Sequence, residues 1–530
     1  HFKTEVHHVN AEERECYVCG NVNPEQIFNI IESKVVDEFG NLTDIRKKQP
    51  KEWNEAYLNN KNNPKVEDRT EGIKTYASKP GLFKQFRVFF KRDILSKLAN
   101  RQYVAINMLE APLLAILLSF FVKFFDFGDD KMNMVYSVFH NENIPQFLFI
   151  AVIIALFLGL TVAAEEIIKD RHILKRESFL NLSRSSYLLS KIGIMFLISA
   201  IQSISFVVVG NLILEISGMW FEHWFILFTA SCFANVLGLI ISASFKTAKV
   251  IYIIVPLLVI PQLLFSGVIV KFDKLHTLFS AQKEVPWIGN MMVSRWAYEA
   301  ITVSQYLDNP LEESLFEYKQ MKSESSWKRD YWLKSMKDQM KLIQDPDVEE
   351  DKKKIARAIL QNEIEKERKV WSNLECENCL EEIQGNGEMP GFTIFLARLK
   401  EQYNQNFNSS TKAIDSVYNM MDKGEKDSLR MTYVNDKLSD LVTNRTEFNQ
   451  LVIYENELIQ KSDPIYQDSR YSRFLDCQFY APYKYFFGQK MSTFYANTLF
   501  IWIITLGLYL VLYFDLLVKL FSLLSFRKKS

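Results

Sequence analysis

The stretch EEIIKDRHILKRESFLNLSRSSYLLSK, residues 165–191, decides the fold because it is a short charged segment between two long apolar runs. These runs, residues 144–164 and 192–213, are each close to the roughly 20 residues that a membrane-spanning helix needs. The segment between them carries Lys169, Arg171, Lys175, Arg176, Arg184 and Lys191. Short basic loops stay on the cytoplasmic side of a membrane. We therefore predict a membrane-tied loop that faces a cytoplasmic partner.

Four further apolar runs bring the number of predicted membrane spans to six. In chain order the spans are residues 103–125, 144–164, 192–213, 224–243, 251–270 and 494–516. Basic residues precede the first span, fill the 165–191 loop, and recur at Lys246, Lys249 and residues 527–529, whereas the loops 126–143 and 214–223 are poor in them. The positive-inside rule then places both termini in the cytoplasm. We expect a mainly α-helical, multi-pass protein of the inner (cell) membrane, with the lipid bilayer as a partner.

Residues 81–101 predict an amphipathic helix that lies in the cytoplasmic interface of the membrane. One side of this helix is apolar and consists of Leu82, Phe86, Phe89, Phe90 and Ile94. The other side is basic and consists of Lys84, Arg87, Lys91, Arg92 and Lys97. Such a helix buries its apolar face at the acyl boundary and turns its basic face to lipid headgroups.

Several motifs in residues 82–306 together resemble the G-type ABC transporters, the White and pleiotropic-drug-resistance group. The pattern DR–x(4)–RE–x(6)–RSSYLLSK resembles their coupling segment, and LLFSGVIV resembles a signature at the outer end of their fifth span. Residues 285–306 resemble their re-entrant helix through Trp287, Ser294, Tyr298 and Glu299. The resemblance implies a bacterial type-2 exporter fold for residues 102–306, preceded by a connecting helix.

The resemblance also implies two sites. The elbow that touches the ATPase domain would use Arg171, Arg176, Glu177 and Tyr187. The substrate cavity would lie between the second and fifth spans on the axis of a homodimer or heterodimer with a second half-transporter. Its apolar lining would be Phe147, Phe149, Leu257, Leu258 and Leu264, which suits lipids or other amphipathic molecules. Phenylalanines in a span can equally face lipid or the protein core.

Glu110 is a carboxylate inside the first predicted span. Charged groups within a membrane are costly and often functional, so Glu110 could face the cavity or exchange a proton. It could equally be a protonated or capped carboxylate near the interface. Both alternatives stay open.

The sequence holds no GxxxxGK[ST] phosphate loop and no LSGGQ-like signature. We expect no catalytic residues here, and we expect ATP and Mg to bind a nucleotide-binding domain that is fused upstream or separate. The stretch NPEQIFNIIE resembles the end of that domain in the G-type family, with Ile27, Ile30 and Ile31 on one helix face. Residues 1–80 would then be a cytoplasmic segment after a missing ATPase domain. Within it, His7, His8, Cys16 and Cys19 have the ligand types for a small zinc site, or are reduced cytosolic thiols.

Residues 307–490 are far longer than the usual external loop of the resembled family. Apolar residues share helix faces at Leu333, Met336, Met340 and Ile343, and at Ile355, Ile359 and Leu360; residues 392–399 and 414–421 predict further helices, and 385–391 a loop. We predict a mostly helical periplasmic domain, followed at 491–530 by the last span and a basic tail. In an oxidising compartment Cys376, Cys379 and Cys477 are disulfide candidates, with the pairing open.

These patterns predict the permease part of an ATP-driven exporter of lipid-like or amphipathic substrates. Lys+Arg and Asp+Glu both number 63, so the net charge does not indicate a nucleic-acid partner. One alternative is an ABC-type mechanotransmitter that acts on a periplasmic partner through residues 307–490. A passive channel or secondary carrier is disfavoured because the spans lack repeated charges. A membrane-anchored structural or receptor protein would not need six spans.

Overall fold

The computed structural model describes residues 24–59, 80–125, 136–177, 182–245, 247–371, 376, 378–385, 387–470 and 473–526. The chain forms two units, His1–Lys79 and Pro80–Ser530. The predicted zinc ligands His7, His8, Cys16 and Cys19 lie outside the described residues, as do Lys246 and the basic residues 527–529.

The described residues of the first unit, 24–59, are largely exposed. They form helix α2 (Pro24–Glu32), an antiparallel hairpin of β1 (Lys34–Val36) and β2 (Leu42–Arg46), and helix α3 (Pro50–Asn59). Ile27, Ile30 and Ile31 are half-buried and Phe28 is exposed, so α2 has the apolar face that its sequence predicts.

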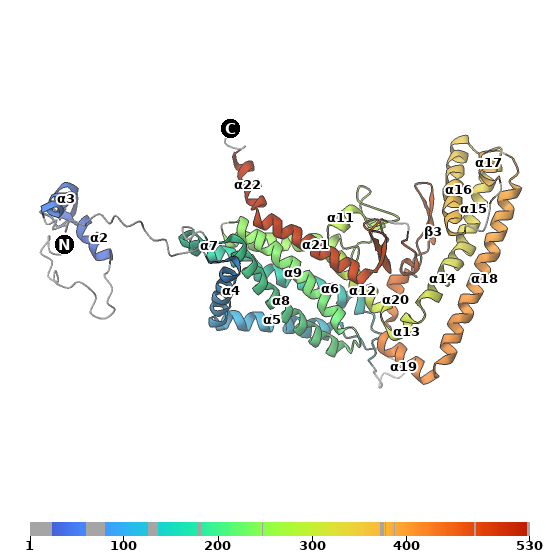
Figure 1. Ribbon diagram of the computed structural model, residues 1–530, viewed down its shortest axis with the longest axis horizontal. Helices are drawn as coiled ribbons and strands as arrows, with labels where there is room; N and C mark the ends of the chain where they lie inside the picture. Colours follow the sequence, from blue (N-terminus) through green and yellow to red (C-terminus); the bar gives the residue numbers. More distant parts are fainter. Residues whose placement is uncertain are drawn as a thin grey trace. The chain divides into compact units, whose positions relative to one another are not determined.

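The second unit contains the membrane helices (Figure 1). In chain order these are α5 (Arg101–Val122), α6 (Ile144–Ala164), α8 (Arg184–Leu214), α9 (Trp220–Ser244), α10 (Ala248–Leu264) and α21 (Thr493–Tyr513), and the short helix α22 (Leu516–Phe526) follows. All of them except α10 and α22 are long and apolar enough to cross a membrane, which makes five candidate spans in the described part of the chain.

The predicted fifth span is shorter than its apolar run. Helix α10 has 17 residues, which at 1.5 Å per residue is roughly 26 Å, less than the hydrocarbon thickness of about 30 Å. The chain turns at Gly267, whose φ of +80° is in the left-handed region and whose Cβ position is filled by the Phe272 ring. The six-span count therefore remains a prediction.

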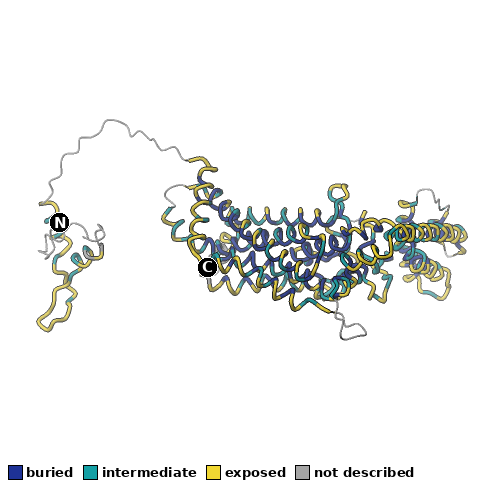
Figure 2. Tube along the Cα trace, turned by 90° about the horizontal axis from the view of Figure 1, so that it is seen from below, coloured by how far each residue is buried: buried dark blue, intermediate teal, exposed yellow. Residues whose placement is uncertain are grey.

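Helix α9 is the centre of the membrane bundle. It packs against α6, α8 and α21, and it is largely buried. Figure 2 shows that buried residues are concentrated within the bundle of long helices. Helices α6 and α9 approach closely because small residues face each other: a Cβ on Gly159 would lie 2.5 Å from the Ser231 carbonyl oxygen, and a Cβ on Gly238 would lie 2.9 Å from Ala163 Cβ.

Gly159→Val tests this close approach. We expect the added side chain to force α6 away from α9 and to destabilise the bundle by about 1–3 kcal/mol, as overpacking of a core generally does. The apparent unfolding temperature of the detergent-solubilised chain measures the effect. Gly507→Val on α21 is the matched control, because no atom lies within 4 Å of a Cβ there. Equal stability of the two variants would contradict the close packing of α6 on α9.

The connecting helix α4 (Leu82–Ala99) packs on α8. Phe89 is buried and Phe86, Phe90 and Ile94 are half-buried, in agreement with the predicted apolar face. Leu82 is exposed, and Lys97 is not on the free basic face but turned inward. The prediction of a loop over residues 165–191 was wrong for much of its length. Helix α7 (Glu166–Glu177) forms the first half of this segment, and the first two turns of α8 form its end.

The polypeptide between α10 and α21 is mostly helical, with two hairpins that the sequence analysis missed. Its helices are η2 (Phe272–Lys274), α11 (Trp287–Asn290), α12 (Val293–Leu307), α13 (Pro310–Glu313), α14 (Phe316–Trp327), η3 (Lys328–Trp332), α15 (Leu333–Gln344), α16 (Glu350–Val370), α17 (Cys379–Gln384), α18 (Pro390–Met420), α19 (Lys423–Tyr433), α20 (Asp436–Thr443) and η4 (Pro464–Tyr466). The antiparallel hairpins pair β3 (Leu451–Tyr454) with β4 (Glu457–Gln460), and β5 (Tyr483–Phe486) with β6 (Gln489–Ser492).

Residues 307–490 contain a hydrophobic core separate from that of the membrane bundle. It is built mainly from α15, α16 and the first half of α18, with Trp332 and Phe392 fully buried. The predicted helices 392–399 and 414–421 are parts of the single helix α18, and Ile355 is exposed rather than on the buried face. Cys376 and Cys379 form a disulfide, whereas Cys477 is a buried free thiol.

Candidate functional site

Helix α7 is fixed to the end of α9 by hydrogen bonds at its first turns. The backbone amides of Ile167 and Ile168 donate to Ser242 Oγ at 3.0 and 3.1 Å, which satisfies two donors that a helix N-terminus otherwise leaves free. One turn later Arg171 donates to the carbonyl oxygens of Ala243 at 3.3 Å and Phe245 at 2.9 Å. A displacement of α7 must therefore move α9 or break these bonds.

Lys191 lies at the centre of a buried group of charges. Its side chain is only 3% exposed, and its ammonium nitrogen contacts Asp93 Oδ1 at 2.8 Å, Glu166 Oε2 at 3.2 Å and Asp170 Oδ2 at 2.8 Å. The three carboxylates come from α4 and α7, whereas Lys191 belongs to α8. One cation thus links three helices that are separate in the sequence.

Neighbouring contacts extend this group. Lys97 Nζ reaches Glu166 Oε1 at 2.6 Å, and the Tyr187 hydroxyl donates to Asp170 Oδ2 at 3.1 Å. The Tyr187 ring meets Phe89 of α4 edge to face, with 5.8 Å between ring centroids. We call Asp93, Lys97, Glu166, Asp170 and Lys191 the elbow cluster. Because paired charges in a poorly hydrated site hold a definite geometry, the elbow cluster joins α4, α7 and α8 into one structural unit.

The four residues predicted to contact an ATPase are not equivalent in the structure. Arg176 is exposed. Glu177 pairs with Arg92 at 2.9 Å, and Arg171 is occupied by the carbonyls at the end of α9. Tyr187 is buried within the elbow. Of these four residues, Arg176 is therefore the one whose exposed side chain can contact a partner without breaking a contact described above.

A cavity of about 480 Å³ lies beside the elbow cluster, between α7, the beginning of α8 and the end of α21. Arg184 closes one side of it through an ion pair with Asp515 and a hydrogen bond of 3.2 Å to the Leu512 carbonyl. Asp515 follows the end of α21 and has a φ of +51°, so the backbone turns where the last span ends. The carboxylate of Asp515 is held by α8 through this ion pair with Arg184.

A second charged group is buried where α12, β5 and α21 meet. Glu299 Oε2 lies 2.5 Å from Lys484 Nζ and 2.7 Å from Asn497 Nδ2, and Lys484 Nζ also reaches Asn497 Oδ1 at 2.9 Å. Arg295, one helical turn before Glu299, stacks on Trp296 with 3.9 Å to the ring centroid. We call Arg295, Glu299, Lys484 and Asn497 the Glu299 cluster. Its charged side chains are at most 1% exposed.

Burial lowers the pKa of Lys484 to about 8, although the Glu299 carboxylate opposes this effect by favouring the ammonium form. The other predicted residues of the re-entrant motif differ in their surroundings. Ser294 is buried and bonds Gln262 of α10, with its amide at 3.0 Å and its hydroxyl at 2.6 Å. Tyr298 is buried, and Trp287 is largely exposed.

The predicted substrate-cavity residues differ in burial within this single chain. Phe147 and Phe149 are buried within the bundle, where Phe147 stacks on Phe206 and Phe149 meets Tyr298 edge to face. Leu257 and Leu264 are exposed on α10, whereas Leu258 and Glu110 are half-buried. In this single chain the phenylalanines pack in the core and two of the three leucines face outward.

Sequence reasoning missed Asp93, Glu166, Asp170 and Lys484 as site residues. A signal for three of them was present, because carboxylates interrupt the basic pattern of α4 and α7 on the face that carries apolar residues. No comparable signal marks Lys484, which stands among aromatic residues in APYKYFF and is far from its partner Glu299 in the sequence.

The long apolar helices around α9, with α4 packed across α8, define a multi-pass integral membrane protein. Comparison with protein families gives a finer result: residues 84–306 match the family described as ABC-2 type transporter. This segment runs from α4 to the end of α12, so it includes the whole elbow cluster, together with Arg295 and Glu299. The match indicates an ABC transporter permease, and such membrane domains generally work with nucleotide-binding domains. A comparison with curated proteins finds no match.

Proposed function

We propose that the chain is the permease part of a G-type, ATP-driven ABC exporter that moves a lipid-like or amphipathic substrate out of the cytoplasm or the inner leaflet. It would work with a nucleotide-binding domain, fused upstream or separate, that binds ATP and Mg, and with a second half-transporter in a homodimer or heterodimer. The ABC-2 match supports the permease role. The observation that carries the proposal is the elbow cluster, because it ties a helix with an exposed basic end to the membrane helices.

The elbow cluster would transmit a movement of α7 to the membrane helices. A nucleotide-binding domain that closes on ATP would press on α7 near Arg176. Since α7 is bonded to α9 through Ser242, and to α4 and α8 through Lys191, these helices would move together. The movement would shift the bundle between inward-open and outward-open arrangements, with ATP binding favouring one of them.

Arg176→Glu tests this route in the complete transporter, that is, the chain together with its nucleotide-binding domain in proteoliposomes. We expect transport to fall about tenfold at unchanged folding stability, because one charge-assisted contact of roughly 1.5 kcal/mol is lost at the interface. ATP hydrolysis should continue without stimulation by substrate. Arg398→Glu on α18 is the control, since that arginine is also exposed but far away in the sequence. Normal transport by Arg176→Glu would refute the assignment of α7 as the coupling element.

A mechanotransmitter is the second candidate, and the separate core within residues 307–490 favours it. Helices α14 and α18 pack side by side. Residues 328–403 can therefore be replaced by a short Gly-Ser linker that keeps α14 next to the remaining part of α18. We expect an exporter with this deletion to keep substrate-stimulated ATP hydrolysis and transport. A mechanotransmitter would keep ATP hydrolysis but lose its action on the periplasmic partner. Loss of that action with no transport in the intact protein would favour the second candidate.

A further inference from the structure

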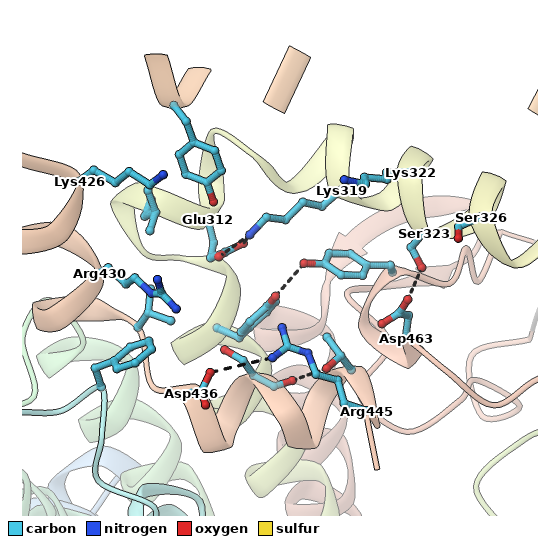
Figure 3. A pocket seen from close by; sticks show the side chains of 18 of the residues that line it. Glu312, Lys319, Lys322, Ser323, Ser326, Lys426, Arg430, Asp436, Arg445 and Asp463 are labelled. Carbon is cyan, nitrogen blue, oxygen red and sulfur yellow. Dashed lines mark hydrogen bonds and ion pairs between the residues drawn. The ribbon is translucent and has the colours of Figure 1, made fainter. Parts of the chain in front are cut away.

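A cavity of about 530 Å³ opens between α14, α18, α19 and α20 (Figure 3). Its floor includes Tyr306 at the end of α12 and Tyr466, whose hydroxyl groups lie 2.7 Å apart. Cavities of about 300–1,000 Å³ accommodate small organic molecules. The volume of this cavity is thus sufficient for a ligand, and its wall includes the helix that carries Glu299.

Cationic side chains outnumber carboxylates in the lining. The cations are Lys319, Lys322, Lys426, Arg430 and Arg445, and the carboxylates are Glu312, Asp436 and Asp463. The carboxylates already have partners in the protein.

Glu312 is engaged through both of its oxygens, which Lys319 Nζ contacts at 2.7 Å each. Asp463 accepts a hydrogen bond of 2.6 Å from Ser323. Arg445 lies 3.9 Å from Asp436 and 3.1 Å from Asp440, so its charge is balanced within the protein. Five cations against three carboxylates leave a formal charge of +2 in the lining, and the lining cations that pair with no carboxylate of the described residues are Lys322, Lys426 and Arg430.

Within the part of the chain that the structure describes, these three cations have aromatic neighbours but no ion pair. Lys426 Nζ lies 3.9 Å from the centroid of Tyr418, the Arg430 guanidinium lies 4.6 Å from that of Phe139, and Lys322 Nζ lies 5.4 Å from that of Phe407. A ring attracts a cation but accepts few of its N–H donors, so each side chain can still donate to an anion. The rings also provide apolar surface beside the charges.

We propose that this cavity binds a small molecule that carries a phosphate or carboxylate group next to an apolar group. The anionic group binds at Lys426 and Arg430, about one helical turn apart on α19, and the apolar group lies against Tyr418. Lys322 lies on the other side of the cavity, beyond Glu312 and Lys319 (Figure 3). A soluble metabolite and the headgroup of an anionic lipid share this chemistry. The site does not depend on the proposed transport function, because it uses only residues of the 307–490 region, Phe139 and the end of α12.

Titration calorimetry with phenyl phosphate tests the proposal on the full-length chain in nanodiscs of phosphatidylcholine. The variants are Lys426→Gln and Arg430→Gln, with Lys322→Gln for the other side of the cavity. Lys423→Gln is the matched control, because Lys423 lies on α19 and is exposed but does not line the cavity. We expect binding of phenyl phosphate that weakens about tenfold in Lys426→Gln and in Arg430→Gln, the effect of losing one charge-assisted hydrogen bond, and that weakens less in Lys322→Gln. The control should bind as the unaltered chain does.

Two further measurements identify the chemical group that binds and its source. Phenol, which lacks the charge, should bind much more weakly than phenyl phosphate. Nanodiscs that also contain phosphatidylglycerol separate the two sources: competition with phenyl phosphate identifies a lipid headgroup as the ligand chemistry, and unchanged binding identifies a soluble anion. Absence of phenyl phosphate binding, or equal binding by Lys426→Gln and Lys423→Gln, would overturn the proposal.

Discussion

Lys191→Met should lower the free energy of unfolding by about 3–5 kcal/mol, the effect of removing one partner from a buried ion pair. Methionine fills a similar volume, so the loss comes from charge rather than from a cavity. It leaves Asp93, Glu166 and Asp170 close together with one fewer cation. The apparent unfolding temperature in detergent, followed by tryptophan fluorescence, measures the effect. In the complete transporter, transport should fall with it.

Lys169→Met is the control for this experiment. Lys169 is on the same helix as two of the carboxylates, but its side chain is 60% exposed and pairs with Glu165 at the surface. Such a pair contributes about 0–1 kcal/mol. Adding Asp93→Asn to Lys191→Met should restore part of the lost stability, because it removes one uncompensated negative charge. If Lys191→Met and Lys169→Met unfold at the same temperature, the elbow cluster does not hold α4, α7 and α8 together.

Glu299→Gln should also cost about 3–5 kcal/mol, because it leaves Lys484 and Arg295 buried without their counter-charge. Glutamine keeps the shape of the side chain and removes only the charge. Exposed Glu313 on α13 provides the control, and Glu313→Gln should change stability by less than about 0.5 kcal/mol. Thermal unfolding at neutral pH compares the two.

The same variant should show a characteristic pH dependence. Lys484 has a pKa of about 8 in the folded chain and about 10.4 when unfolded, so between these values the unfolded state binds more protons. Stability then increases with pH in this window, and it is independent of this group below pH 8. Without Glu299 the pKa of Lys484 in the folded chain falls further, so the pH range in which stability increases extends to lower pH. The stability lost in Glu299→Gln should therefore be smaller at pH 9 than at pH 7; an unchanged loss would contradict an uncompensated Lys484.

The membrane helices were the most predictable part of the fold. A run of about 20 apolar residues has few alternatives to a helix, so α6 begins and ends where the sequence predicts. Helix α10 differs from its predicted span because hydropathy does not register backbone geometry. The apolar run continues to Val270, but the chain turns at Gly267.

The sites were less predictable, since each depends on contacts between distant residues. Arg176 and Tyr187 are both found by the coupling motif, but only the structure separates the exposed arginine from the buried tyrosine. The partners of Lys191 come from α4 and α7, and a linear pattern of basic residues suggests repulsion there rather than pairing. The hairpin that positions Lys484 was missed because each of its strands has only four residues.

The three acceptors around Lys191 have a mechanical consequence. If Asp93 moves away from Lys191, the ammonium group keeps Glu166 and Asp170, which are on the same helix. Helix α4 also remains bound to α7, because Lys97 pairs with Glu166 and Arg92 pairs with Glu177. Loss of one contact therefore does not separate α4, α7 and α8, and a displacement of α7 still reaches the other two helices.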